Sequence, residues 1–340
     1  MLALAHDGAA HATADELTKS LHLPEPIVTH SGYHNLHERL QTQQNNTGFT
    51  LEVANRLWSA KDFPPLPAYI TQTEDTYQAG VETVDFTQPA AAAGIINTWV
   101  AQRTHDQIKN LVGAGDLTGA RLVLTNAIYF KGDWDTPFKE AATTDAKFSI
   151  TVDRQVKTKL MHRMDYFGYA AVTPKDGPAF QALEMDYAGH DLAMLILLPA
   201  AGDLNKFESI LDAGLIDSVV QQLSHEEVQV AFPRFKMEDS FELNKALQGV
   251  GIVSAFTDRA DFSGLSAKEG LFISAALHKA YVEVNEKGTQ AAAVTGEMLP
   301  SAARPAPPVE FTADHPFIFI IRDKGSGGIL FLGRVMDPTK

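Results

Sequence analysis

Cysteine is absent from the 340 residues, so disulfides, thiol catalysis and Cys-ligated zinc are excluded. The absence does not fix the compartment, because a core of this size needs no disulfides. No apolar run approaches the roughly 20 residues that cross a bilayer. Positive charge is also scarce: 28 Lys and Arg stand against 42 Asp and Glu, for a net charge of −14. We therefore expect no nucleic acid, heparin-like polyanion or membrane as a partner.

Motifs of common catalytic sites are missing too. There is no G-x-S-x-G elbow, and the nearest segment, "KGSGGIL" (324–330), predicts a glycine turn between two strands. "GAGDLTG" (113–119) follows a helical pattern rather than a strand, which indicates a loop and not a dinucleotide site. We expect no catalysis and no cofactor.

Three histidines, His30, His34 and His37, fall on one face of an expected helix. Three imidazoles on one face are compatible with a metal site. A solvated helix face is the simpler alternative, and we favour it because only Glu38 is placed to add a carboxylate. We therefore predict no metal site.

What is present indicates a folded α+β protein. The chain is 45% hydrophobic and carries 19 Phe, 8 Tyr and 3 Trp, and no linker-like stretch divides residues 50–280, so we predict one domain over residues 1–340. Apolar periodicity predicts helices at 12–22, 33–44 and 91–112. Alternating or continuous apolar segments predict strands at 49–58, 121–134, 145–151, 180–188, 192–199, 227–235, 272–285, 316–322 and 328–335.

The segment "NEKGTQAAAVTGEMLPSAARPAPPV" (285–309) interrupts this pattern with small, nearly uncharged residues. Thr289 could cap a short Ala-rich helix, or the segment could be a flexible linker. A third alternative is an exposed functional loop, since long loops inside a compact domain tend to be functional. Composition alone leaves all three open.

Flanking segments carry a family resemblance. In chain order they read "LEVANRLW", "LVLTNAIYFKGDWDTPF", "LAMLILLP", "FPRFKMEDSFELNKALQGVGI", "AFTDRADFSGLS", "ISAALHKAYVEVNEKGTQAAAV", "HPFIFIIRD" and "FLGRVMDP". Over nearly its whole length the chain resembles a serpin. The resemblance implies three β-sheets, about eight helices and an exposed reactive loop over about 286–308.

The expected function is that of a monomeric suicide substrate of serine proteases, with cysteine proteases as a second target class. In the family, the target attacks the loop, and the cleaved loop inserts into the central sheet carrying the covalently acylated protease. A non-inhibitory serpin, cleaved as a plain substrate or serving as a binding module, is the alternative.

"NEKGTQAAAV" matches the family's hinge, which comprises Glu286 and the inserting residues Gly288, Thr289, Ala291, Ala292 and Ala293. An inserting strand passes between packed strands, so side chains that face the core must be small and uncharged. Thr289, Ala291 and Ala293 would face inward. Gly288 permits the reversal of the chain.

Three further matches concern the opening of the sheet. The resemblance places Asn126 and His278 as a polar pair at the sheet's sliding centre, and Trp134 at the point where the loop first enters. Without the resemblance, His278 would be a core histidine and Trp134 a core aromatic residue.

The scissile bond follows from a count. In the family it lies a nearly fixed number of residues beyond the hinge glutamate, and sixteen residues on from Glu286 is Ala302. We therefore predict cleavage at Ala302–Ala303, which fits the small specificity pocket of elastase-like and subtilisin-like enzymes. Arg304 is a rival, but Pro305 follows it. Leu299 is a second rival that would shorten the inserting segment.

The chain opens on "MLALA" without a capping residue, as a helix cut in its middle would. We expect the natural product to extend upstream of Met1, with a helix, a strand and a serine partner of the polar pair in the missing part. No signal peptide is recognised in this stretch. We expect an extracellular or cell-envelope location, with the cytoplasm as the alternative.

Overall fold

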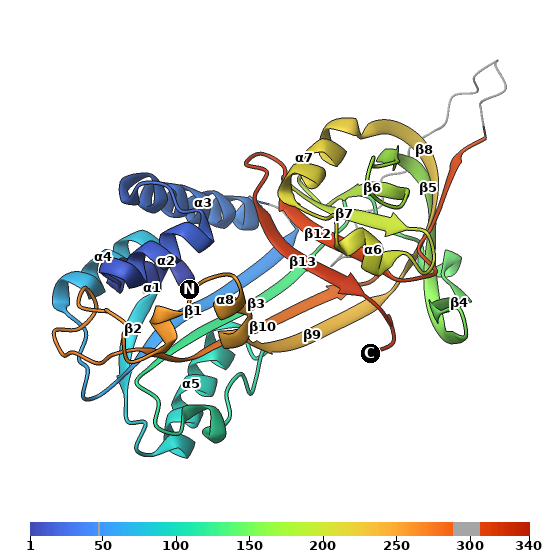
Figure 1. Ribbon diagram of the computed structural model, residues 1–340. Helices are drawn as coiled ribbons and strands as arrows, with labels where there is room; N and C mark the ends of the chain where they lie inside the picture. The colour runs from blue at the N-terminus through green and yellow to red at the C-terminus, as the bar shows by residue number, and fades with distance from the viewer. Residues whose placement is uncertain (47, 288–306) are drawn as a thin grey trace. The chain divides into compact units, whose positions relative to one another are not determined.

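The structure is a computed structural model that describes residues 1–46, 48–287 and 307–340 (Figure 1). Backbone hydrogen bonds join its strands into two sheets. The described residues fall into two compact units. The first unit comprises residues 1–45, 51–130 and 238–282, and the second comprises residues 46–50, 131–237 and 283–340. Each unit is therefore assembled from segments that are far apart in the sequence.

The helices of the described residues lie mostly in the N-terminal third. They are α1 (Leu2–Gly8), α2 (His11–Leu21), α3 (Pro26–Asn46), α4 (Pro67–Tyr77), α5 (Pro89–Arg103), α6 (Leu204–Glu208), α7 (Ala213–Gln222) and α8 (Asn244–Gly249), with short 3-10 turns at Ala114–Leu117, Glu140–Ala142 and Ser254–Phe256.

Strands dominate the rest of the chain. They are β1 (Phe49–Ala60), β2 (Gly80–Val84), β3 (Leu122–Gly132), β4 (Thr144–Thr151), β5 (Arg154–Val172), β6 (Phe180–Asp186), β7 (Leu192–Pro199), β8 (Ser224–Pro233), β9 (Phe235–Glu242), β10 (Ile273–Val284), β11 (Val309–Thr312), β12 (Phe317–Asp323) and β13 (Ile329–Val335).

A five-stranded sheet with the order β2-β1-β3-β10-β9 lies chiefly in the first unit. Its central strands are covered on both faces. Successive side chains of a strand point to opposite sides, so neighbouring residues pack in different clusters. Val123 packs in a cluster with Ile96 and Val100 of α5. Its neighbour Leu122 packs in a second cluster with Leu4 of α1 and Leu17 of α2. The nearly continuous apolar run of β3 follows from this double burial.

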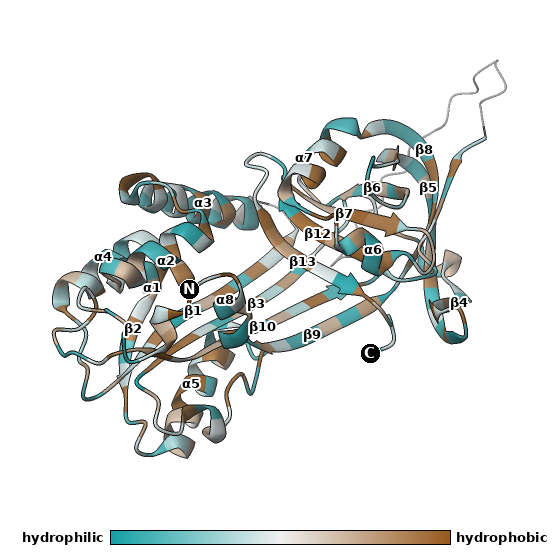
Figure 2. Cartoon of the chain, viewed as in Figure 1, coloured by the Kyte–Doolittle hydropathy of each residue, from teal (hydrophilic) through white to brown (hydrophobic). Residues whose placement is uncertain are grey.

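An eight-stranded sheet forms most of the second unit, in the order β11-β8-β5-β6-β7-β12-β13 with β4 paired to β5. All eight residues of β7 are buried, and the strand is brown along most of its length in Figure 2. Leu195 and Leu197 of β7 pack with Phe207 of α6 and Val219 of α7. The two apolar C-terminal runs become β12 and β13, which pair antiparallel beside β7.

The resemblance implies three sheets, whereas the strands of the described residues form two hydrogen-bonded sheets. Strand β5 explains the difference, because it is long enough to pair with β4 and β8 over its first part and with β6 over its last. It thereby fuses two smaller sheets into one. The predicted α+β class with about eight helices is confirmed.

Boundaries differ from expectation where backbone geometry intervenes. The helix predicted over 91–112 ends at Arg103, because His105 and Asp106 adopt positive φ angles of 48° and 62°. The segment 324–330 forms the expected turn, with Gly327 at φ +74° between β12 and β13. In the described parts of the chain, no helix is long and apolar enough to cross a membrane.

Gly333 of β13 generates a stability prediction. A Cβ at this position would lie 2.6 Å from Cε1 of the buried Phe319, the residue of β12 that pairs with Gly333. We expect Gly333→Ala to lower the free energy of unfolding by about 1–3 kcal/mol in urea titrations. Gly94→Ala is the control: its Cβ meets nothing within 4 Å in α5, and it should stabilise by about 0.5–1 kcal/mol. Equal stability of Gly333→Ala and the parent would contradict the packing.

Candidate functional site

The last residues before the loop are held by an aromatic group in the second unit. The buried indole of Trp134 donates its Nε1–H to the carbonyl oxygen of Asn285 at 2.9 Å. The same ring stacks on Tyr187, with centroids 4.7 Å apart. The backbone N–H of Phe138 donates to the carbonyl oxygen of Glu286 at 2.9 Å. Two consecutive carbonyl groups at the base of the loop are thus fixed in place.

The side chain of Glu286 is held in the same region, and only 3% of the residue is exposed. Its carboxylate accepts hydrogen bonds from the hydroxyl of Thr143 and the guanidinium of Arg234, with which it also forms an ion pair. Burial alone would raise the pKa of Glu286, but these hydrogen bonds and the charge of Arg234 hold it below its usual value. We call Trp134, Phe138, Thr143 and Arg234 the loop anchor.

The far end of the loop is also tied to the second unit. Strand β11 begins at Val309 and pairs in parallel with β8, with Val309 opposite Val228 and Phe311 opposite Val230. Phe311 is fully buried. The described residues on either side of 288–306 are therefore both held by contacts within the second unit.

The parallel pairing of β3 with β10 lies in the first unit. It runs from Leu122 opposite Ile273 to Phe130 opposite Val282, and Figure 1 shows the two strands side by side in the middle of their sheet. We call these residues, 122–130 and 273–282, the β3–β10 seam. Tyr129 and Tyr281 lie across it with ring centroids 5.0 Å apart. Strand β10 is also the strand whose end leads directly to Asn285 and the loop.

A polar row crosses the seam. His278 Nδ1 lies in hydrogen-bond contact with Asn126 Oδ1, and Asn126 Nδ2 donates to Asn55 Oδ1 of β1 at 2.5 Å. The ring of Phe241 stacks on His278 at 5.9 Å. Burial lowers the pKa of His278, because a charged imidazole loses solvation in this position. The row thus links three neighbouring strands through neutral groups.

The structure brings together some of the predicted residues and leaves others undescribed. Asn126 and His278 meet in the polar row, and Trp134 and Glu286 meet at the loop anchor. The hinge and bond residues Gly288, Thr289, Ala291, Ala292, Ala293, Ala302 and Ala303 lie outside the described residues.

Sequence reasoning missed four partners: Asn55, Phe138, Thr143 and Arg234. Each is distant in sequence from the group that it contacts, so no local pattern links them. The one available signal was Arg234, a cation in the apolar segment "FPRF" where β8 ends and β9 begins, since a charge among apolar residues requires a partner.

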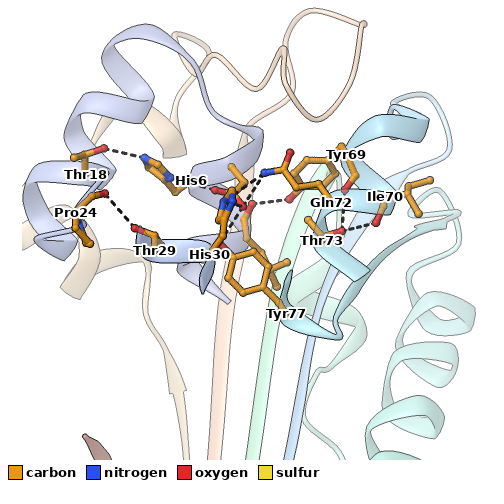
Figure 3. A network of polar contacts seen from close by, with 12 residues as sticks. His6, Thr18, Pro24, Thr29, His30, Tyr69, Ile70, Gln72, Thr73 and Tyr77 are labelled. Carbon is orange, nitrogen blue, oxygen red and sulfur yellow. Dashed lines mark hydrogen bonds and ion pairs between the residues drawn. The ribbon is translucent and has the colours of Figure 1, made fainter. Parts of the chain in front are cut away.

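The predicted histidine face is only partly solvated. Figure 3 shows His30, Gln72 and Tyr77 pointing toward one another from α3 and α4. All three donate to or contact one carboxylate oxygen of Asp7 in α1, at 2.9, 3.2 and 2.9 Å. Burial would raise the pKa of Asp7, but the hydrogen bonds from His6, His30 and Tyr77 hold it below its usual value. The cluster therefore joins three helices.

His34 lies elsewhere on α3, 3.4 Å from Glu38. In the parts of the chain that the structure describes, no group of three His, Cys, Asp or Glu side chains is placed to hold a metal ion.

The Glu286–Arg234 ion pair generates a second prediction. Glu286→Gln removes a buried charge that accepts two hydrogen bonds, and we expect the free energy of unfolding to fall by about 1–3 kcal/mol at pH 7. Because the folded-state pKa is depressed, the contribution is present above about pH 4.3 and is lost as the pH falls through the folded value. Urea titrations from pH 3 to 7 should therefore converge for parent and variant at the acid end.

The neighbouring residue supplies a matched control. Lys287 lies 3.3 Å from Glu140, and both side chains are more than half exposed. Lys287→Gln should change stability by less than about 1 kcal/mol. An equal loss in the two variants would show that the loop anchor does not depend on the buried carboxylate.

The polar row generates a third prediction. The folded-state pKa of His278 is lowered, so the unfolded chain binds a proton first and stability declines as the pH falls below about 6.5. His278→Gln keeps a polar partner for Asn126 and should flatten the decline between pH 6.5 and 5. His34→Gln, at an exposed position, should leave it unchanged. The same slope in all three proteins would refute the role of His278.

Comparisons with known proteins agree with this geometry. A family profile described as Serpin (serine protease inhibitor) matches residues 1–338. Leukocyte elastase inhibitor of Bos taurus is 39% identical over 348 residues, covering 99% of this chain and 90% of that protein. A serpin-like protein of Thermococcus kodakarensis is 38% identical over 342 residues, covering 99% of this chain and 78% of that protein.

Solved structures give the same result. Serpin48, described as a highly specific serpin of the insect Tenebrio molitor, matches with a TM-score of 0.85 at 32% identity, covering 99% of this chain and 88% of that one. Uncleaved ovalbumin matches with a TM-score of 0.86 at 28% identity, covering 99% of this chain and 90% of that one. With a profile spanning nearly all of it and relatives above 30% identity along its length, the chain belongs to the serpin family.

Proposed function

We propose that this serpin inhibits serine proteases, with cysteine proteases as a second target class, by acting as a suicide substrate. The proposal treats residues 1–340 as one domain and the chain as a monomer, in an extracellular or cell-envelope location with the cytoplasm as the alternative. The observation that carries it is the β3–β10 seam: two central strands in direct parallel pairing, one of which leads into the loop.

The seam explains why insertion would be favourable. A strand that leaves the end of β10 and turns back runs antiparallel to β10, and therefore antiparallel to the parallel strand β3 as well. Insertion would replace one parallel pairing by two antiparallel pairings, which are somewhat more stable per residue. Some 14 inserted residues at about 1 kcal/mol per net hydrogen bond give on the order of 10 kcal/mol.

The chemistry requires only the protease's own catalytic groups. Its serine oxygen attacks the carbonyl carbon of Ala302, the bond to the nitrogen of Ala303 breaks, and that nitrogen leaves with a proton. The product is an acyl ester between the serine and the newly formed carboxyl end. Insertion of the loop would then displace the attached protease before water hydrolyses the ester.

The target class is inferred from two sources. The small residue Ala302 before the proposed bond suits an elastase-like or subtilisin-like specificity pocket. Leukocyte elastase inhibitors of several mammals are 36–39% identical to this chain. We therefore propose an elastase-like or subtilisin-like target. A panel of purified proteases, screened for a complex that survives SDS, separates an inhibitor from a serpin that is merely cleaved.

The hinge supplies the fourth prediction. Thr289→Arg would place a charge facing the core of the inserted sheet, so the variant should be cleaved as a substrate with the yield of covalent complex reduced at least tenfold. Gln290→Arg is the matched control, because its side chain would face outward, and it should retain most of the complex. An unchanged yield in Thr289→Arg would rule out insertion.

The scissile bond supplies the fifth prediction. Denaturing an elastase complex should release a C-terminal peptide, and mass spectrometry should show that it begins at Ala303. A peptide that begins at Pro305 would instead identify Arg304 as the residue before the bond. One that begins at Pro300 would identify Leu299.

A further inference from the structure

Two large side chains are exposed on β5, which β8 separates from β11, the strand that follows the loop. Met164 and Tyr166 of β5 are 53% and 55% exposed. They alternate with the buried Phe167 and the largely covered Arg163, whose guanidinium lies over the Phe167 ring. Their exposure is therefore not a consequence of a frayed strand, because the strand holds its register with β8 from Leu160 to Tyr169.

Strand register assembles a continuous face around these side chains. Met164 lies opposite Gln229 of β8, and Gln229 lies opposite Glu310 of β11. Tyr166 lies opposite Glu227. The ring of His225 stacks on Tyr166, with centroids 5.2 Å apart. We call these six residues the β5–β8–β11 face.

The face combines features of protein interfaces. Tyrosine and methionine are enriched at such surfaces, and the stacked Tyr166 loses little conformational freedom on binding. A hollow of about 440 Å³ opens beside the ring pair, lined by both Tyr166 and His225. It offers space for a side chain that projects from a partner.

The face carries two negative charges, those of Glu227 and Glu310. Neither Glu227 nor Glu310 makes an ion pair within the described residues 1–46, 48–287 and 307–340. A basic partner would therefore gain charge complementarity, and a second copy of this chain, whose net charge is −14, would meet repulsion.

Distance along the chain from the proposed bond puts the target protease within reach of β11. Glu310 lies eight residues beyond Ala302, and eight extended residues span at most about 28 Å. A compact protease of roughly 240 residues has a diameter near 45 Å, from the usual scaling of size with length. A protease engaged at the loop is thus wider than the chain that separates the bond from β11, and the strand β11 lies within reach of its body.

We propose that the β5–β8–β11 face is a docking surface for the body of the target protease, and that it selects proteases with basic side chains beside the active-site cleft. This inference rests on the proposed function, because it requires attack at the loop. Contacts of this kind act mainly on the rate of association, since complementary rim charges steer the encounter.

The experiment compares the second-order rate of attack on the loop for variants of the full chain. Met164→Ala/Tyr166→Ala should slow attack by an elastase with a basic cleft rim by about tenfold, without changing the stoichiometry of inhibition. Glu227→Gln/Glu310→Gln should slow it about fivefold at low salt and flatten its decline between 0.05 and 0.5 M NaCl. A subtilisin-like enzyme with an acidic rim should respond less to both.

Matched controls come from other surfaces. Leu332→Ala removes a side chain of similar exposure, 57%, on β13, and Glu269→Gln removes an exposed carboxylate in the first unit. The protease should attack both variants at the parent rate. Rates within twofold of the parent in every face variant would overturn the proposal, as would a dimer in sedimentation that Tyr166→Ala dissolves.

Failure of the proposed function remains distinguishable from failure of the docking surface. If the parent is cleaved without forming a covalent complex, inhibition is wrong, and the rate of cleavage replaces the rate of inhibition as the measure. A tenfold loss in that rate would still support the docking surface. A loop that no protease of the panel attacks would overturn both.

Discussion

Strands β3 and β10 run parallel and share a ladder of hydrogen bonds although both of their faces are buried. Burial on both faces requires continuous apolar sequence, and parallel pairing requires a long connection between the strands. The chain between them, residues 133–272, contains most of the second unit. The seam therefore constrains the composition of its own strands and the order of elements in the whole chain. In the proposed insertion, an entering strand would meet packed side chains on both faces of the sheet, a condition that the small uncharged residues after Gly288 in the sequence would suit.

Polar groups stabilise this arrangement at two places and in two different ways. In the polar row, Asn126 and His278 are matched to each other and stay neutral, so they link strands without the cost of a buried charge. At the loop anchor a full charge is buried, and it is tolerated because Arg234 and Thr143 supply an opposite charge and a hydrogen bond. The row therefore carries no buried charge, whereas the anchor buries one and pairs it with an opposite charge.

The sequence predicts most strands of the two sheets, but only part of the polar row and of the loop anchor. The strands at 121–134, 192–199 and 272–285 were recognisable because double burial makes them continuously apolar. Strand β5 was not recognised, because charged and imidazole side chains alternate through "RQVKTKLMHRM" and one of its faces is solvated. Strand β11 is only four residues long. The roles of Asn55 and Arg234 could not be predicted for another reason. Their partners lie more than fifty residues away in the sequence, and only tertiary structure brings them together. The sequence predicts a solvated face for His30, whereas the structure shows a hydrogen bond between His30 and Asp7 of another helix.

Strand β5 connects these observations. Its covered side chains pack against the sheet and join two ladders into one, while its outward side chains Met164 and Tyr166 meet solvent. Such alternation gives β5 no continuous apolar run, and it also leaves large side chains exposed beside β8. Met164 and Tyr166 are each more than half exposed, so both side chains are accessible to a partner. The position of β11, directly after the loop, makes a protein that has engaged the loop the nearest candidate.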